Sequence, residues 1–163
     1  MSKKEVFPQE VKEKIDQWIE RYPSGRKQSA VIPGLHILQE YNNGYLTTEL
    51  MNSLALYLEM SEVAVYEVAT FYSMYNLSPV GKHQINVCNN ISCKLRGADE
   101  IVEYLSKKLN IKPGETTEDG KYTLRTVECQ GACCGAPMLE VNKVFHEYLT
   151  PSSVDKILEK LES

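Results

Sequence analysis

The chain contains 163 residues, of which 42% are hydrophobic and 25% charged. This composition is ordinary for a globular protein and excludes disordered, collagen-like and low-complexity classes. The chain has 18 lysine and arginine residues and 22 aspartate and glutamate residues, so its formal net charge is −4. It lacks the excess of positive charge that drives sequence-independent nucleic-acid binding. The five cysteines all lie between Cys88 and Cys134.

The N-terminus carries lysines but has no apolar stretch behind them, so no secretory signal is expected. No window approaches the roughly 18 uninterrupted apolar residues that a membrane span requires. We therefore expect a cytoplasmic protein, in which thiols stay reduced. Clustered cysteines in such a chain are more often metal ligands or redox-active thiols than structural disulfides.

The first half of the chain predicts four short amphipathic helices. Pro8 suits a first helical turn, Gly44 suits a left-handed C-terminal cap, and Ser61 suits an N-cap. Such helices with short links indicate a small helical bundle or an extended helical arm, and we predict the bundle. Apolar residues recur with a 3.6-residue period near residues 8–22, 29–42, 47–58 and 61–72.

Aromatic residues are concentrated near the end of the fourth predicted helix. Either they pack in the core of the helical domain or they form a docking face for a partner. We predict the core, because apolar helix faces usually bury within their own domain. The residues concerned are Tyr66, Phe71, Tyr72 and Tyr75.

A domain boundary is expected where proline and glycine interrupt the pattern, at residues 78–82. We predict a helical domain over residues 1–78 and a second domain over residues 79–163. The second domain has the predicted order β-α-β-β-β-α, which indicates an α+β or α/β sandwich. Its strands are predicted at 83–87, 122–127, 138–141 and 144–146, and its helices at 97–109 and from residue 150 onward.

Two cysteine pairs follow the ends of predicted strands, CNNISC at 88–93 and CQGAC at 129–133. Loops at neighbouring strand ends can bring four thiolates together, and four cysteines are the ligand set of a [2Fe–2S] cluster. Gly131, Ala132 and Gly135 would let the backbone approach the inorganic sulfurs, with N–H groups as hydrogen-bond donors.

Other chemistry is compatible with the same cysteines. Paired cysteines also bind zinc tetrahedrally. A dithiol centre is a third alternative, although no thioredoxin-type C-x-x-C spacing occurs. Cys129 forms a C-x₄-C pair with Cys134 as well as a C-x₃-C pair with Cys133, so spacing does not choose between these two neighbours.

The segments 87–97 and 128–137 resemble the NuoE family, the thioredoxin-like [2Fe–2S] E subunits of respiratory NADH:quinone oxidoreductase (complex I). The resemblance covers nearly the whole chain. It extends to the segments SAVIPGLH at 29–36, ATFY at 69–72, PGETT at 113–117 and LTP at 149–151.

This resemblance implies a thioredoxin-like [2Fe–2S] ferredoxin domain after a helical N-terminal domain. It implies a cluster held by Cys88, Cys93, Cys129 and Cys133, with Cys133 at the family's fourth-ligand position and Cys134 without an assigned role. The chain would then be an enzyme only as part of a complex, without a complete active site of its own.

The implied partners are the flavoprotein subunit that binds NADH and FMN and other subunits of the peripheral arm of complex I. The implied location is cytoplasmic and peripheral to the plasma membrane. Related chains serve NAD-linked hydrogenases and formate dehydrogenases, and these contexts stay open as alternatives, as does a structural zinc module.

No catalytic acid, base or nucleophile is expected on the chain. His36, His83 and His146 are isolated and suit packing or surface positions, and no P-loop or G-x-G-x-x-G motif occurs. The expected role is one-electron storage beside a flavin that receives two electrons at once. Lys94 and Arg96 would either stabilise the reduced cluster or be exposed charges at a helix start.

Overall fold

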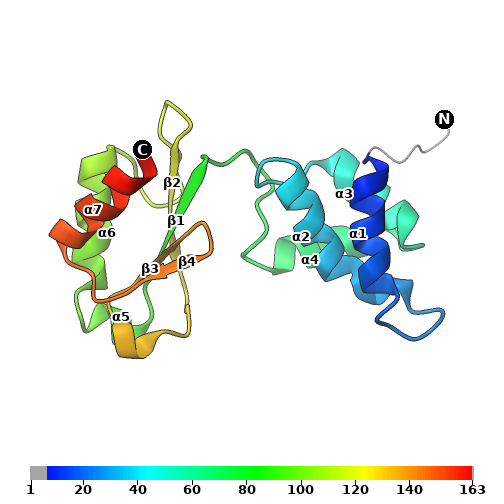
Figure 1. Cartoon of the computed structure of the whole chain (residues 1–163), viewed down its shortest axis with the longest axis horizontal. Coiled ribbons are helices and arrows are strands. Elements are labelled where there is room, and N and C mark those ends of the chain that lie inside the picture. The colour runs from blue at the N-terminus through cyan, green and yellow to red at the C-terminus, as the bar shows by residue number, and fades with distance from the viewer. Residues whose placement is uncertain (1–6, 163) are drawn as a thin grey trace. The chain divides into compact units, whose positions relative to one another are not determined.

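The computed structural model describes residues 7–162, which form two compact units that meet in sequence between Pro79 and Val80 (Figure 1). The first unit is helical, and the second combines helices with a sheet. No helix in the described part of the chain is both long enough and apolar enough to cross a membrane.

The helical unit contains the four predicted helices. They are α1 (Gln9–Ile19), α2 (Val31–Tyr41), α3 (Thr48–Tyr57) and α4 (Glu62–Phe71), with a 3₁₀ turn η1 (Lys27–Ala30) before α2. Pro8 is the N-cap of α1 rather than a residue of its first turn, and the helix ends three residues before the predicted end. Buried apolar side chains from all four helices make its core, including Ile15, Leu35, Leu38, Leu54 and Val65.

Two predicted helix ends are confirmed by hydrogen bonds. The Ser61 hydroxyl accepts from the backbone N–H of Ala64 at 3.3 Å at the start of α4. At the end of α2, Gly44 has a φ of +92° and donates its N–H to the carbonyl of Gln39 at 2.7 Å. Glycine suits this left-handed position because it has no Cβ to clash with the preceding turn.

The prediction that the aromatic residues near α4 lie in the core is wrong for Phe71 and only partly right for Tyr72. Tyr75 is buried and its hydroxyl donates to the carbonyl of Ile32 at 2.8 Å. Phe71 is 80% exposed and Tyr72 is 37% exposed. The helical period places Phe71, the last residue of α4, on the side away from the buried Val65 and Ala69. Tyr72 is already extended, so the period does not apply to it.

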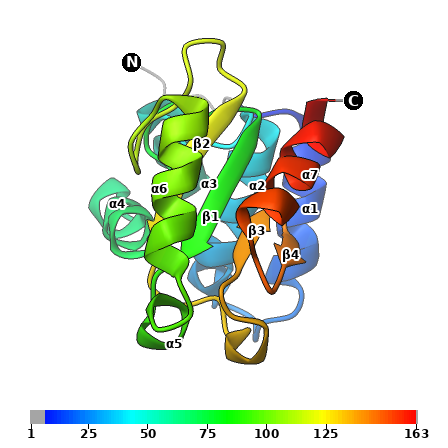
Figure 2. The same ribbon diagram turned by 90° about the vertical axis from the view of Figure 1, so that its left-hand side faces the viewer.

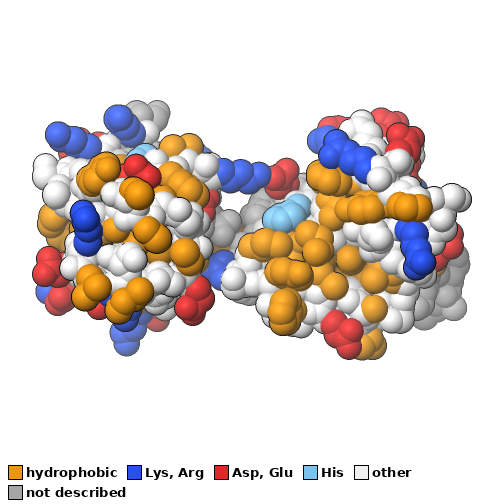
Figure 3. Space-filling model, turned by 90° about the horizontal axis from the view of Figure 1, so that it is seen from below, with side chains coloured by type: hydrophobic (Ala, Val, Ile, Leu, Met, Phe, Trp, Pro, Cys, Tyr) orange, Lys and Arg blue, Asp and Glu red, His pale blue; other side chains and the backbone are white. Residues whose placement is uncertain are grey.

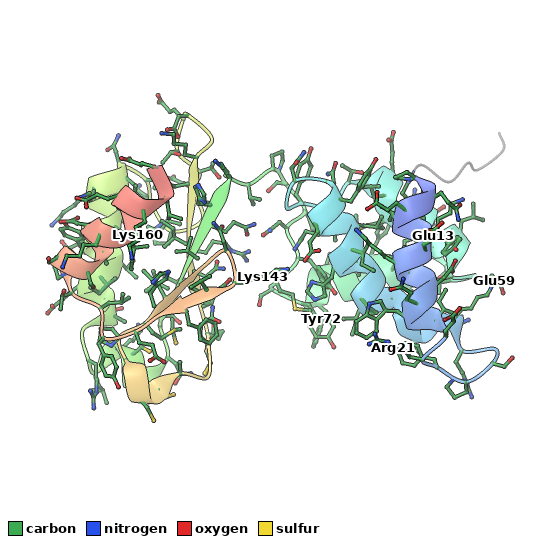
Figure 4. The ribbon with its side chains drawn as sticks, viewed as in Figure 1. Glu13, Arg21, Glu59, Tyr72, Lys143 and Lys160 are labelled. Carbon is green, nitrogen blue, oxygen red and sulfur yellow. The ribbon has the colours of Figure 1, made fainter. Side chains whose placement is uncertain are left out.

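Tyr72 therefore lies at the surface of the helical unit, where it is labelled in Figure 4. Figure 3 shows hydrophobic side chains gathered on one face of this unit. Exposed apolar residues of the unit include Trp18, Phe71, Tyr72, Met74 and Leu77.

The second unit is a mixed four-stranded sheet in the order β2-β1-β3-β4. β1 and β2 are parallel, whereas β3 pairs antiparallel with both β1 and β4. The helices α6 (Ala98–Leu109) and α7 (Pro151–Glu162) cover the same face of the sheet (Figure 2). The predicted mixture of helices and strands is confirmed. The strands are β1 (His83–Cys88), β2 (Tyr122–Val127), β3 (Leu139–Val141) and β4 (Val144–His146).

Two short elements were not predicted, α5 (Ile91–Lys94) and the 3₁₀ turn η2 (Cys133–Gly135). Each contains cysteine. One turn of helix is too short to show a hydrophobic period, so pattern analysis treats it as loop.

The turn between β3 and β4 is formed by Asn142 and Lys143, as predicted, with φ values of +51° and +68°. Lys143 marks this turn in Figure 4. The Asn142 amide lies 2.8 Å from Nδ1 of His83, whose ring packs at 5.7 Å from the ring of Tyr122. His83 is therefore a packing residue that ties the hairpin to β1.

This contact predicts a pH dependence of stability. Burial lowers the pKa of His83, and the charge of Lys82 lowers it further, whereas the hydrogen bond with Asn142 partly opposes them. The unfolded chain then takes up a proton at a higher pH than the folded chain does. This contribution to stability is present in full above the ordinary histidine pKa of about 6.5 and is lost as the pH falls below it.

We expect the free energy of unfolding, measured by urea denaturation, to fall between about pH 7 and 5, and we expect His83→Gln to flatten this dependence. Equal slopes in the two proteins would contradict the assignment.

Candidate metal centre

Both cysteine loops leave the sheet at the same edge. Cys88 is the last residue of β1 and pairs in register with Val127, the last residue of β2. The N–H of Asn89 donates to the carbonyl of Val127 at 2.9 Å, which continues the pairing one residue beyond the strands. Cys129 follows two residues after Val127. In Figure 2, α5 and the segment that precedes β3 lie together at this end of the unit.

One cysteine pair forms a buried half of the centre. Cys88 and Cys93 are 2% and 1% exposed, and they pack with Met138 and Ala98. The N–H of Cys88 donates to the carbonyl of Met138 at 3.2 Å. In the short helix α5, Cys93 is buried and Ile91 is 66% exposed. The single turn therefore directs the thiol into the protein and the apolar side chain of Ile91 to the surface.

Burial raises the pKa of the Cys93 thiol to about 11, and a hydrogen bond and charge repulsion from Cys88 add to this rise. Cys133 contributes a smaller repulsion in the same direction. Two other predicted ligand thiols, Cys88 and Cys133, therefore act electrostatically on Cys93. A thiol with this pKa is protonated near neutral pH, so a metal that binds it must displace a proton.

The other cysteines form an exposed half. Cys129, Cys133 and Cys134 are all exposed. Gly131 donates its N–H to Sγ of Cys129 at 3.4 Å, with a φ of +74° that a side chain would disfavour. Such N–H donors stabilise negative charge on a ligand sulfur and raise the reduction potential of a cluster. The donor observed here points to a cysteine sulfur, whereas approach of the backbone to the inorganic sulfurs stays a prediction.

The exposed half is held by the chain that follows β4. The N–H of Tyr148 donates to the carbonyl of Gly135 at 2.7 Å, and the N–H of Leu149 donates to the carbonyl of Pro137 at 3.0 Å. The peptide bond before Pro137 is cis. These bonds attach η2, which contains Cys133, to a segment distant in the sequence.

The donor set suits a soft metal centre. All five cysteines are free thiols. Among residues 7–162, no group of three or more His, Cys, Asp or Glu side chains is already gathered in a metal-binding arrangement. Two cysteine pairs at one sheet edge nevertheless supply sulfur ligands of the kind that iron–sulfur clusters and zinc require.

The charges beside Cys93 are at the surface. Lys94 pairs with Asp99 at 3.7 Å, with both side chains largely exposed, and Arg96 is also exposed. Of the two interpretations, the one that treats Lys94 and Arg96 as exposed charges near a helix start agrees with their positions. Exposed ion pairs of this kind contribute little to stability.

Sequence reasoning missed Glu147. Its side chain lies directly against Gly135, because a Cβ added to that glycine would be 2.3 Å from Cδ of Glu147. No local pattern links a residue after β4 to the cysteine segment, so only the folded chain reveals this contact.

Comparison with known proteins identifies the family. The family model for thioredoxin-like [2Fe–2S] ferredoxins matches residues 15–162. The chain is 46% identical over 142 residues to the E subunit of the NADH-quinone oxidoreductase of Rickettsia typhi, which covers 87% of this chain and 84% of that protein. It is 38% identical over 157 residues to the mitochondrial NADH dehydrogenase [ubiquinone] flavoprotein 2 of Dictyostelium discoideum, with coverage of 96% and 64%.

A solved structure shares the fold. The crystal structure of an air-oxidised NAD⁺-reducing [NiFe]-hydrogenase aligns with a TM-score of 0.68 at 20% identity, over 79% of this chain and 23% of the hydrogenase chain. At this identity the likeness concerns the fold alone.

The relatives confirm the resemblance to the E subunit of NADH:quinone oxidoreductase that the cysteine segments carry. Spacing had left zinc and a dithiol centre open, and the family match decides for a [2Fe–2S] cluster as the cofactor. Two cysteine loops at one edge of a mixed sheet, one pair buried and one exposed, agree with that cofactor. The chain belongs to the thioredoxin-like [2Fe–2S] ferredoxin family.

Proposed function

We propose that the chain is the electron-transfer subunit of an NADH:quinone oxidoreductase and carries one electron at a time through its [2Fe–2S] cluster. The observation that carries this proposal is 46% identity over 87% of the chain to a protein named as the E subunit of that complex. Like its relatives, the chain acts as one component of an oxidoreductase, and the oxidation of NADH takes place on another subunit.

Cys88, Cys93, Cys129 and Cys133 are the proposed ligands. The buried pair supports this, since Cys88 and Cys93 lie together in an apolar site, and Cys133 as well as Cys88 raises the pKa of Cys93. Cys134, in contrast, is not among the groups that raise the pKa of Cys93. Metal binding would bring the exposed loop to the buried pair with loss of the thiol protons.

The bound cluster supplies a one-electron couple, and the chain shapes that couple in two ways. Burial of Cys88 and Cys93 excludes water from one side, which disfavours additional negative charge. The N–H of Gly131 at Cys129 favours negative charge on the other side. The resulting potential is a balance of these opposed effects.

The partner that we propose is the flavoprotein subunit that binds NADH and FMN, within the peripheral arm of a complex on the cytoplasmic side of the plasma membrane. Relatives named as subunits of a quinone oxidoreductase support a multisubunit assembly. The hydrogenase neighbour, at 20% identity, supports the fold alone, whereas 46% identity to an E subunit supports the quinone oxidoreductase context.

The ligand assignment predicts different effects for two adjacent cysteines. Cys133→Ser should lose most of the bound iron, because it removes one of four thiolates, whereas Cys134→Ser should retain it. Iron and sulfide content of the purified proteins, with the visible absorption of the cluster, would measure this. The reverse outcome would reassign the fourth ligand to Cys134.

The functional assignment predicts what the chain binds in the cell. Purified from its own organism through a tag, the chain should be brown and give a [2Fe–2S] electron paramagnetic resonance signal after dithionite treatment. A flavin-containing subunit and quinone-reductase subunits should copurify, as identified by mass spectrometry and flavin fluorescence. Copurified hydrogenase or formate dehydrogenase subunits would support the alternative contexts, and a colourless zinc protein would contradict the cluster.

A further inference from the structure

The side chain of Glu147 lies along the segment that contains Cys133. A Cβ built on Gly135 would be 2.6 Å from Cβ, 2.6 Å from Cγ and 2.3 Å from Cδ of Glu147. The absence of a side chain at Gly135 thus provides the space that Glu147 occupies. We propose that Glu147 is a fixed negative charge that lowers the reduction potential of the cluster, an inference that rests on the proposed role of Cys133 as a ligand.

The contact limits the distance between the carboxylate and the ligand. Consecutive Cα atoms are about 3.8 Å apart, so Cδ of Glu147 lies at most about 11 Å from Cα of Cys133. The backbone holds this arrangement, because the N–H of Tyr148 donates to the carbonyl of Gly135 at 2.7 Å. A side-chain contact and a backbone hydrogen bond therefore both hold the Glu147 carboxylate near the segment that contains Cys133.

Glu147 has no ion-pair partner among the described residues 7–162. The other glutamate of this hairpin differs, since Glu140 accepts hydrogen bonds from the amide of Asn86 and the N–H of Lys143. On the opposite cysteine loop, the cation Lys94 is already paired with Asp99.

A carboxylate at this place acts on one step, the arrival of an electron. Four thiolates give an oxidised cluster a formal charge of −2, and one electron from the donor changes it to −3 with no proton required. A unit charge about 10 Å away, at an effective dielectric constant of about 40 to 80, changes the reduced-to-oxidised ratio by a factor of about two to four. Salt weakens this effect because Glu147 is exposed.

The test is a redox titration of the cluster-loaded full chain, followed by electron paramagnetic resonance. Glu147→Gln keeps the shape of the side chain and removes its charge. At the midpoint potential of the wild-type protein, we expect the reduced-to-oxidised ratio of Glu147→Gln to be about two to four times that of wild type. The g values should be unchanged, because the ligands are the same.

Two controls separate charge from packing. Glu147→Asp shortens the side chain but keeps the charge, so its midpoint should stay close to that of wild type. Glu118→Gln removes another exposed glutamate just before the N-terminal end of β2, whereas the cysteine loop leaves the C-terminal end. The six residues of β2 span about 20 Å, so this variant should leave the midpoint unchanged.

An unmoved midpoint in loaded Glu147→Gln, or an equal shift in Glu118→Gln, would overturn the proposal. Glu147→Ala is a second neutral variant, and loss of the cluster from both neutral variants would show a purely structural role and overturn it too. A protein that holds zinc and no iron in every variant would contradict the proposed function, and the Glu147 proposal with it. A loaded protein with an unmoved midpoint contradicts the Glu147 proposal alone.

Discussion

The parallel pairing of β1 and β2 is the constraint on which the metal centre depends. Six residue pairs, from His83 with Tyr122 to Cys88 with Val127, align the two strands so that both end at the same edge. Parallel neighbours need a crossover connection, and this connection contains α6, which covers the sheet. Two cysteine loops far apart in the sequence thereby become neighbours. A shift in this register would move one pair of sulfurs away from the other.

The centre built on this edge has two unlike halves. Cys88 and Cys93 are buried together among apolar residues, and burial raises the pKa of the Cys93 thiol. Cys129 and Cys133 lie in an exposed segment that accepts backbone hydrogen bonds from the chain after β4. A bound cluster would therefore have one side anchored in the protein and one side close to the surface, which suits the exchange of electrons with another protein.

The helical unit contributes a different property, an apolar surface on a unit that already has its own core. Phe71, Tyr72 and Met74 are exposed where α4 ends, although Tyr75 in the same segment is buried. Grouped apolar side chains on the surface of a small folded unit are typical of contacts with other proteins. This agrees with the multisubunit complexes to which the relatives belong.

Elements with a clear period or a specific cap could be predicted from the sequence. The long helices, the four strands, the cap at Ser61 and the turn at Asn142 all depend on residues close together in the chain. The cysteine pairs belong to the same class, because their chemistry and spacing are local. The single turns α5 and η2 escaped prediction because they are too short for a period.

The tertiary structure decided what depends on contacts between distant segments. It buried Cys93 beside Cys88 and left Cys129 exposed, and it buried Tyr75 while Phe71 at the end of α4 stayed exposed. It also placed the side chain of Glu147 against Gly135. The sequence by itself determined that thiols are the available ligands, because ligand chemistry belongs to the side chains. Only the fold set the burial and charge around them, because these arise when separate parts of the chain pack together.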